Sequence, residues 1–322
     1  MTMYRFAAIL SVFLLCTAGK SAAQADADPE RIRPGYPVYS QYLHNGLMIN
    51  PAYAGSRDAL SVLLSCRVQW MGIPDAPRIE SVSLHSPLRN DKVALGLKAG
   101  FMQYGVTKSQ SIYGIYAYHI RLKTGKISLG LKAGTELSNT DYRGIPGITR
   151  PDPAFPETDK SYIFPNAGAG VYYFTDKFFA GLAVPSFLFY RNTGNGHVQA
   201  SHSFSEYDFV VSAGALLSLS PVFMIKPSLL IDYSMNKSDH LNQFDVNCNF
   251  IFSDLVWLGA SWRITEQVAV GHLQIQINPR LMAGLSYDYP AGRMNSFSRG
   301  SSEIILRYEF GSRISAANPK YF

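Results

Sequence analysis

Side chains suited to catalysis or metal binding gather in one long loop that is rich in Gly and Asn. His197 and His202 share this loop with Ser201, Ser203 and Glu206. Histidine with serine and a carboxylate can form a nucleophile and its base, and histidine with glutamate can bind a metal ion. A loop of this composition holds a catalytic triad poorly, and the spacing matches no strong metal-binding pattern. We therefore expect these residues to belong to a surface loop.

Motifs of the common enzyme classes are absent from the sequence. There is no Gly-x-Ser-x-Gly elbow, no His-Glu-x-x-His helix, no Cys-x-x-Cys pair and no phosphate loop. His119 and His272 fall within expected strands, where we expect them to face a lumen or a rim rather than to bind a ligand. The sequence predicts a protein that is not an enzyme and has no cofactor and no metal site.

The elements that position these residues are strands with one apolar and one polar face. In residues 59–70 the apolar face is Leu60, Val62, Leu64, Cys66, Val68 and Trp70, and the polar face is Ser61, Ser65, Arg67 and Gln69. Residues 242–252 repeat the pattern. A period of two indicates β-strands. Many such strands in one chain, with aromatic residues and short turns, predict a membrane barrel with lipid outside and a polar lumen.

The predicted fold is all-β, a transmembrane antiparallel β-barrel of about 14 strands. The candidate strands are residues 59–70, 79–86, 93–104, 110–121, 126–138, 164–174, 178–188, 206–219, 222–235, 242–252, 255–264, 267–277, 280–289 and 302–310. Beyond the N-terminus, no apolar run approaches the roughly 20 residues of a membrane helix. The composition, 13% aromatic and 16% charged, would also suit a soluble sandwich.

The connections between these strands alternate between tight turns and longer segments. Tight turns are expected at 123–125, 175–177, 220–221, 253–254 and 278–279, and longer connections at 139–162, 188–204, 236–241 and 290–301. Outer-membrane barrels have short periplasmic turns and long extracellular loops. The short loop Thr265-Glu266 is an exception on the long side. An even number of strands places both ends of the barrel on the periplasmic side.

The N-terminus has the features of a secretory signal peptide. Arg5 precedes the apolar stretch Phe6–Leu15, and small residues follow at Ser21–Ala25. We divide the chain into a signal peptide (1–25), a periplasmic or lumen-contacting N-terminal segment (26–58), an outer-membrane β-barrel (59–310) and a periplasmic C-terminal tail (311–322). The formal net charge of +6 does not indicate nucleic-acid binding, because an exported protein would not encounter nucleic acid.

Charged residues and cysteines follow the same two faces. The charges on polar faces are Arg67, Lys98, Arg121, Lys132, Glu136, Asp232, Arg263, Arg307 and Glu309. A charge on the lipid side costs about 2–4 kcal/mol near the midplane, so we expect these side chains to point inward. Because both signs occur, a lumen filled by ion pairs is expected rather than a strongly ion-selective pore. Cys66 and Cys248 fall on apolar faces, which favours two lipid-facing side chains over a disulfide.

The segment that leads into and through the first strand carries motifs of a different kind. They are Tyr39-Ser40-Gln41-Tyr42-Leu43-His44-Asn45, Asn50-Pro51-Ala52-Tyr53-Ala54-Gly55-Ser56-Arg57 and Arg67-Val68-Gln69-Trp70-Met71-Gly72-Ile73, followed by Ala76-Pro77. With the Gly-Leu-Lys-Ala-Gly repeats at 96–100 and 130–134 and the final strand Glu303-Ile304-Ile305-Leu306, the chain resembles the PorP/SprF family of type IX secretion system membrane proteins. Arg78 departs from the small polar residue expected after Pro77. The resemblance covers essentially the whole mature chain.

This resemblance implies a function that the residues alone do not. It implies a barrel in the outer membrane of Bacteroidota-type bacteria, surrounded by outer-membrane lipid, that works with the secretion and gliding machinery. The implied partners are a secreted adhesin or other type IX substrate and other type IX machinery subunits. The alternative is an outer-membrane channel or hydrophobic-solute transporter.

Residues of the N-terminal motifs are the candidates for binding a partner or plugging the lumen: Gln41, Tyr42, Asn50, Pro51, Tyr53, Gly55, Gln69 and Trp70. The alternative for Asn50–Gly55 is a turn that leads the chain into the first strand. Asn-Pro starts turns, and Gly55 permits a positive φ. The alternative for Trp70 is an aromatic residue of the membrane girdle.

Overall fold

A computed structural model describes residues 31–32, 40–88, 91–141, 160–192, 198–235 and 241–310. The expected signal peptide (1–25) and C-terminal tail (311–322) lie outside these ranges, as do His197 and most of the loop expected at 139–162. Within the described ranges, no helix is both long enough and apolar enough to cross a membrane.

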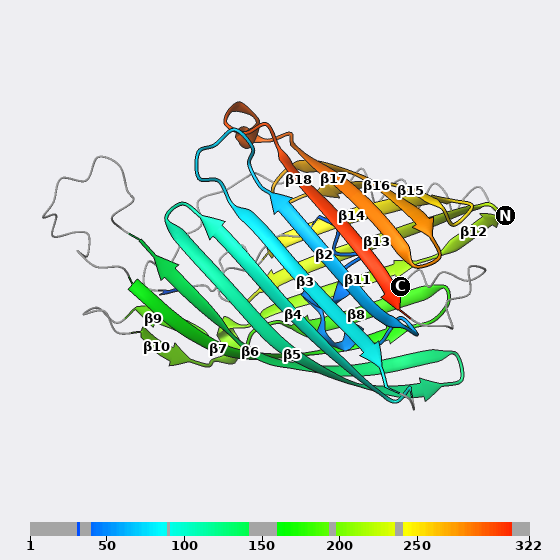
Figure 1. Ribbon diagram of the computed structural model, residues 1–322, viewed down its shortest axis with the longest axis horizontal. Coiled ribbons are helices and arrows are strands. Elements are labelled where there is room, and N and C mark those ends of the chain that lie inside the picture. Colours follow the sequence, from blue (N-terminus) through cyan, green and yellow to red (C-terminus); the bar gives the residue numbers. More distant parts are fainter. Residues whose placement is uncertain are drawn as a thin grey trace, which may run out of the picture.

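Fourteen strands of the described chain form one closed antiparallel barrel (Figure 1). They are β2 (Leu60–Val68), β3 (Arg78–Pro87), β4 (Val93–Tyr104), β5 (Thr107–Leu122), β6 (Gly125–Thr140), β7 (Lys160–Phe174), β8 (Phe178–Val184), β11 (Asp208–Ala215), β13 (Phe223–Ser234), β14 (Leu241–Phe252), β15 (Val256–Arg263), β16 (Val268–Asn278), β17 (Leu281–Pro290) and β18 (Ser301–Phe310). The barrel closes where the last strand, β18, pairs with the first, β2. The short strand β12 (Leu217–Ser220) follows β11 and pairs with the same neighbour, β13. The predicted barrel is confirmed.

The two faces of the strands differ as the alternation predicts. In β2, Leu64 and Val68 face outward and are 49% and 38% exposed, whereas Ser65 and Arg67 face the lumen and are buried. The polar residues of β14 at 243, 245, 247 and 249 are likewise buried. Cys66 and Cys248 are both free thiols on the outward face. Apolar side chains therefore face the lipid, and polar groups bind one another inside.

The lumen contains charges of both signs, as the sequence predicts. The predicted inward charges that are buried are Arg67, Lys132, Glu136, Asp232, Arg263 and Arg307. Arg121 differs because it lies at the end of β5, where its side chain is 62% exposed and pairs with Asp91 at 3.2 Å. The predicted inward charges that are buried therefore point into the lumen, whereas Arg121 lies at a rim.

The connections confirm the alternation of tight turns and longer loops. One rim carries the tight turns, such as 123–124 between β5 and β6 and 279–280 between β16 and β17. The other rim carries longer connections, with residues 105–106 as a second short turn beside the one at Thr265-Glu266. The strand order places the start of β2 and the end of β18 at the tight-turn rim.

The N-terminal residues extend to the opposite rim. Strand β1 (Arg31–Ile32) pairs with β9 (Phe189–Asn192), which pairs with β10 (Val198–Ser201) in the long connection between β8 and β11. Two 3-10 helices, η3 (Phe204–Glu206) and η4 (Arg293–Ser296), lie in connections at this same rim. Since β2 begins at the tight-turn rim, β1 and β2 lie at opposite rims of the barrel.

Candidate functional site in the barrel lumen

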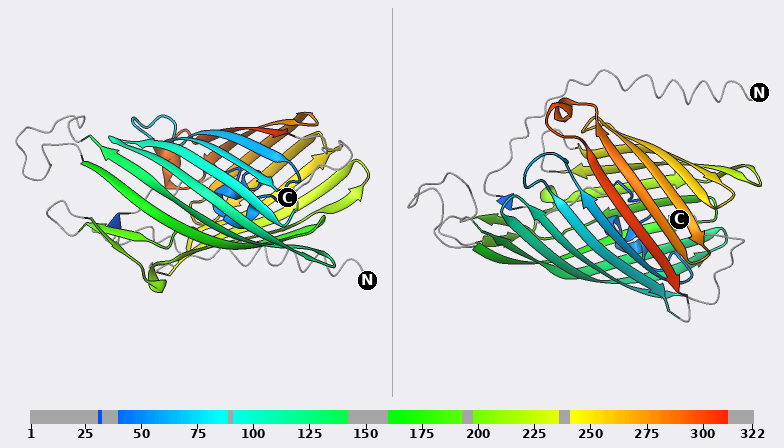
Figure 2. Two further views of the ribbon diagram at one scale, coloured as in Figure 1. Left: turned by 60° about the horizontal axis from the view of Figure 1, so that its bottom comes forward. Right: turned by 45° about the horizontal axis from the view of Figure 1, so that its top comes forward.

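Residues 40–57 lie inside the barrel, where Figure 2 shows them as the blue segment enclosed by strands. The segment contains the short helix α2 (Gly46–Ile49) and the 3-10 helix η1 (Pro51–Tyr53). Leu47, Ala52 and Ala54 are at most 1% exposed. Because strands surround these side chains, the wall of the barrel takes the place of solvent around the segment.

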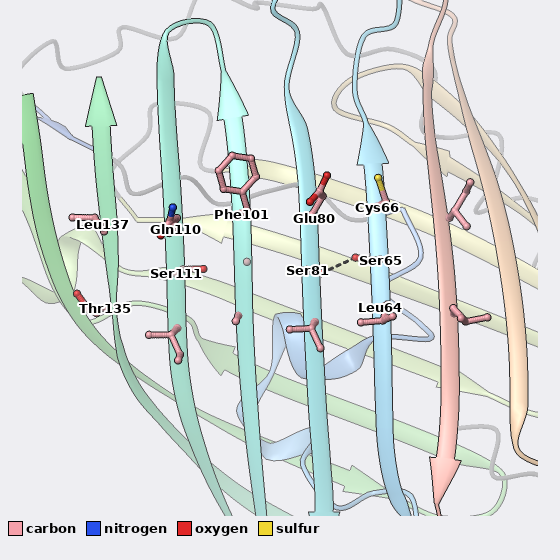
Figure 3. A pocket seen from close by; sticks show the side chains of 16 residues that line it. Leu64, Ser65, Cys66, Glu80, Ser81, Phe101, Gln110, Ser111, Thr135 and Leu137 are labelled. Atoms are coloured by element: carbon pink, nitrogen blue, oxygen red, sulfur yellow. Dashed lines mark hydrogen bonds between the residues drawn. The ribbon is translucent and has the colours of Figure 1, made fainter. Parts of the chain in front are cut away.

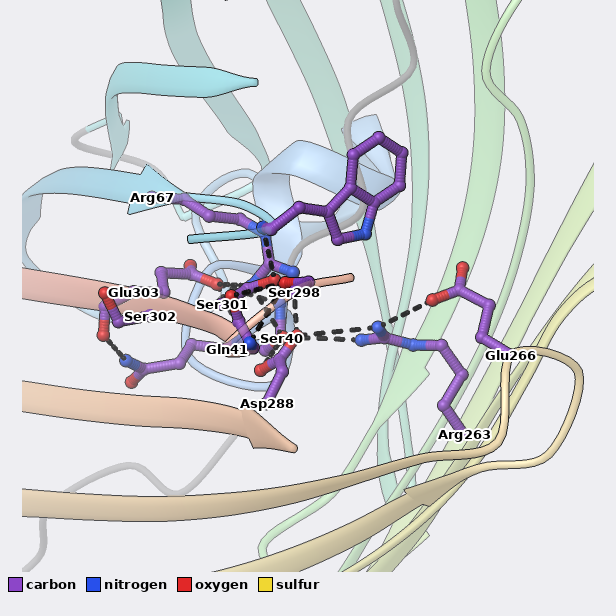
Figure 4. A network of polar contacts seen from close by, with 12 residues as sticks. Ser40, Gln41, Arg67, Arg263, Glu266, Asp288, Ser298, Ser301, Ser302 and Glu303 are labelled. Atoms are coloured by element: carbon purple, nitrogen blue, oxygen red, sulfur yellow. Dashed lines mark hydrogen bonds and ion pairs between the residues drawn. The ribbon is translucent and has the colours of Figure 1, made fainter. Parts of the chain in front are cut away.

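A buried polar network holds the start of this segment near the long-loop rim (Figure 4). We call Ser40, Arg67, Arg263, Asp288 and Glu303 the Ser40 cluster. The Ser40 hydroxyl donates to Asp288 over 2.7 Å, and its N–H donates to Oε2 of Glu303 over 2.8 Å. Arg67 donates from Nη1 to Ser40 Oγ over 2.9 Å and pairs through Nη2 with Asp288 at 2.7 Å. Arg263 donates from Nη2 to the same hydroxyl oxygen over 3.3 Å.

The Ser40 cluster joins four strands through one residue of the segment. Its charged side chains, on β2, β15, β17 and β18, are at most 4% exposed. Removing charges from water offsets most of what their pairing contributes, but losing one partner of a buried pair costs about 3–5 kcal/mol. The cluster therefore fixes the position of Ser40 more than it adds stability.

The middle of the segment contacts strands on different sides of the lumen. Ser83 of β3 donates to Oδ1 of Asn45 over 2.9 Å. Lys98 of β4 donates from Nζ to the carbonyl oxygen of Met48 over 3.3 Å. The ring of His44 packs edge-on against Trp257 of β15, with 5.2 Å between the ring centroids. The segment thus contacts strands on several sides of the lumen and not one strand only.

The turn at residues 50–55 forms for local reasons. Oδ1 of Asn50 accepts the N–H of Ala52 over 2.9 Å, and Pro51 fixes φ at the first position of η1. Gly55 has a φ of 74°, in the left-handed region that favours glycine. The Ala54 carbonyl accepts from Nε2 of His119 over 2.9 Å, so this histidine faces the lumen as expected. The predicted turn exists, and it is buried within the barrel.

Glycines of the wall make room for this turn. A Cβ at Gly130 of β6 would lie 2.1 Å from the backbone N of Ala52, and one at Gly170 of β7 would lie 2.1 Å from Oδ1 of Asn50. Nδ2 of Asn50 donates to the carbonyl oxygen of Val171 over 3.0 Å. A side chain at either glycine would push the turn away from the wall, so these two positions are matched to residues 50–52.

The lower end of the segment is tied to the last strand. Arg57 forms a buried ion pair and hydrogen bond with Glu309 of β18. Nε of Arg307 lies 3.4 Å from the same carboxylate. The segment is thus fixed at both rims, by the Ser40 cluster above and by Arg57 directly before β2.

Of the loop residues considered for catalysis, Ser201 and Glu206 have structural partners in the described part of the chain. Glu206 pairs with Arg191 and accepts from the Ser201 hydroxyl over 2.9 Å. His202 is exposed and makes no side-chain hydrogen bond to another described residue. No group of three His, Cys, Asp or Glu residues within the described ranges could hold a metal ion. The contacts of Glu206 therefore order the loop around η3.

Comparison with known protein families identifies the family of this chain. The sequence profile of the type IX secretion system membrane protein PorP/SprF matches residues 33–308. The chain belongs to the PorP/SprF family. The match includes the whole lumen segment as well as the strands, and the family and the barrel fold together place the protein in the outer membrane. The matched family is described as membrane proteins of a secretion system and not as enzymes. No curated protein matches the chain in sequence.

Several solved outer-membrane barrels are similar in structure to this PorP/SprF protein. The toluene transporter TbuX of Ralstonia pickettii has a TM-score of 0.51 at 9% identity, over 82% of this chain and 92% of its own. The outer membrane protein Omp33 of Acinetobacter baumannii has a TM-score of 0.46 at 6% identity, over 79% of this chain and 99% of its own. A FadL homologue of Pseudomonas aeruginosa has a TM-score of 0.45 at 12% identity, over 81% and 93%. At such identities the likeness to TbuX shows the fold alone.

The structure separates the eight candidate residues of the PorP/SprF motifs into two groups. Those in the lumen are Gln41, Tyr42, Asn50, Pro51, Tyr53 and Gly55, all of them buried. Gln69 and Trp70 instead follow β2 at the long-loop rim. The Gln69 N–H donates to the carbonyl of Pro77 over 2.9 Å, and the Trp70 N–H donates to the Ser301 hydroxyl over 3.1 Å. The Trp70 side chain is 39% exposed.

Sequence reasoning missed the residues that receive the segment. Asp288 and Glu303 bind Ser40 from different parts of the chain, and no spacing connects them. Gly130 does occur in the second Gly-Leu-Lys-Ala-Gly repeat of the PorP/SprF pattern. A glycine within a strand signals that some backbone approaches closely, but it does not identify which one.

Proposed function

We propose that this PorP/SprF protein is a non-enzymatic component of the type IX machinery that supports the export or surface display of a partner adhesin or other secreted substrate. It does so in contact with other machinery subunits. The observation that carries this proposal is the family match over residues 33–308. The filled lumen supports an anchoring role over that of an open channel, because residues 40–57 contact the wall on different sides.

The two groups of candidate residues receive different roles in this proposal. Residues 40–57 act as a lumen plug, since their side chains are bound by the wall and are not available to a partner. Gln69 and Trp70 are the candidates for partner contact, because they lie at the long-loop rim with an exposed indole ring. Aromatic residues of this kind are common anchors of protein interfaces.

Deletion of the gene tests the secretion role. We expect a large secreted protein to disappear from the cell surface, and the tagged wild-type protein to co-purify with that protein or with other type IX subunits. An unchanged set of surface proteins would contradict the proposal. Conductance of the purified wild-type protein in a planar bilayer would support the channel or hydrophobic-solute transporter instead.

Alanine variants test the two roles separately. Replacing Asn50, Pro51 and Tyr53 together should leave the barrel inserted and raise its conductance, because the turn loses its cap, its fixed φ and its ring contacts. Replacing Gln69 and Trp70 should leave conductance unchanged and reduce retention of the secreted partner. If the triple variant does not insert, residues 50–53 are needed for folding. If it inserts with unchanged conductance, the plug assignment is wrong.

A further inference from the structure

The lipid-facing wall between β18 and β6 contains an open groove of about 940 Å³ (Figure 3). Two outward rows of cross-strand neighbours line it. The row nearer the long-loop rim is Ile304, Cys66, Glu80, Phe101, Gln110 and Leu137, and the next row is Leu306, Leu64, Val82, Ala99, Ile112 and Thr135. Ala99 lies between the larger side chains of Val82 and Ile112 in its row, so the groove is deepest at Ala99. The side chains of this second row are apolar except for Thr135, and they form an apolar trough along the groove.

Polar side chains close the end of the groove that points to the long-loop rim. Arg78, Gln103 and Lys108 are consecutive cross-strand neighbours in the row above Glu80 and Gln110. Nε and Nη2 of Arg78 bind one carboxylate oxygen of Glu80 at 2.9 and 2.6 Å. Glu80 thus orients the guanidinium while Nη1 stays available, and the Arg78 side chain is 60% exposed.

The other polar groups at this end have no partner among the described residues. Lys108 forms no ion pair there, and the side-chain amides of Gln103 and Gln110 make no hydrogen bond. Arg78 and Lys108 are two strand spacings apart, roughly 10 Å between their Cα atoms. Side chains of this length reach towards a common anion, and long basic side chains at this level extend to the lipid headgroups.

We propose that this groove binds lipopolysaccharide, a phosphate-bearing glycolipid, with a phosphate between Arg78 and Lys108 and an acyl chain along the row of Ala99. Arg78 and Lys108 outweigh Glu80 by one positive charge, which complements a phosphate. The apolar trough lies two rows below the cations, beyond the row of Glu80 and Gln110. The polar end lies at the long-loop rim, and the long loops of outer-membrane barrels face outside. The site is therefore at the level of the outer leaflet.

Binding of labelled lipopolysaccharide to the purified full-length protein tests the site. The double variant Arg78→Ala/Lys108→Ala should bind about tenfold more weakly or worse, because two charge-assisted hydrogen bonds are lost. The matched control is Lys123→Ala, which removes an exposed lysine in the turn between β5 and β6 at the other rim, and it should bind as the wild type does. Ala99→Leu should also weaken binding, since it fills the trough and leaves the charge unchanged.

A second arm separates the glycolipid from other phosphate-bearing lipids. Vesicles of phosphatidylglycerol should bind the wild-type protein more weakly than lipopolysaccharide does, and the double variant should change this weak binding little. The proposal is overturned if the double variant binds lipopolysaccharide as tightly as Lys123→Ala does, or if phosphatidylglycerol binds equally well. All of these side chains lie outside the lumen, and heat-modifiable migration on gels confirms that each variant has folded.

Discussion

Substitution of Gly130 by alanine should release the lumen segment without damaging the wall. The added Cβ would lie 2.1 Å from the backbone N of Ala52 and 2.4 Å from the carbonyl carbon of Pro51, where 3.4 Å is ordinary contact. Both neighbours are backbone atoms, so the turn must move by roughly an ångström, and the bond from Asn50 to Val171 lengthens with it. Overpacking of this kind costs about 1–3 kcal/mol.

That strain acts only while the segment occupies the lumen. Relief of 1–3 kcal/mol on release therefore shifts the equilibrium towards an open lumen by about 5- to 150-fold. Single-channel recording of the purified protein in a planar bilayer measures the open fraction directly. The matched control is Gly271→Ala in β16, because a Cβ there meets nothing within 4 Å. If the two variants conduct equally, the fit between Gly130 and residues 51–52 does not keep the lumen closed.

Three further changes test the faces, the path of the chain and the Ser40 cluster. Leu64→Arg should impair assembly by about 2–4 kcal/mol because it places a charge in lipid, whereas Gln69→Arg, beyond the strand at the long-loop rim, should be milder; heat-modifiable gel migration compares them, and equal behaviour would mean that Leu64 does not face lipid. Arg31→Cys should react with an impermeant thiol reagent on intact cells and Thr124→Cys should not, since they lie at opposite rims; the reverse would refute this path. Arg67→Ala should lower the free energy of unfolding by about 3–5 kcal/mol, because Glu303 stays buried without its paired cation and Asp288 keeps only Arg263; unchanged thermal unfolding would show that Arg67 does not stabilise the cluster.

The barrel could be predicted from the sequence, because each strand has to present an apolar face to lipid and a polar face to the lumen. This rule is local: the lumen-facing residues of β2 are polar except Leu63, and in β14 residues 243–249 follow it, whereas Ile251 is apolar and buried. Where the strand boundaries differ, the cause is also local. The strand expected at 178–188 ends at Val184 because Pro185 follows, and proline cannot donate to the ladder. The strand expected at 206–219 is divided between β11 and β12.

The residues that fill the lumen could be identified only from the folded protein. The Asn50–Gly55 turn is readable from its own residues, but whether it lies outside the barrel or within it depends on the glycines opposite. Ser40 and Glu303 are 263 positions apart, and they meet only because β18 closes the barrel against β2. Gly130 and Ala52 fit one another because no side chain separates their backbones. Such pairings follow from the shape of the closed wall, and no periodicity in the chain encodes them.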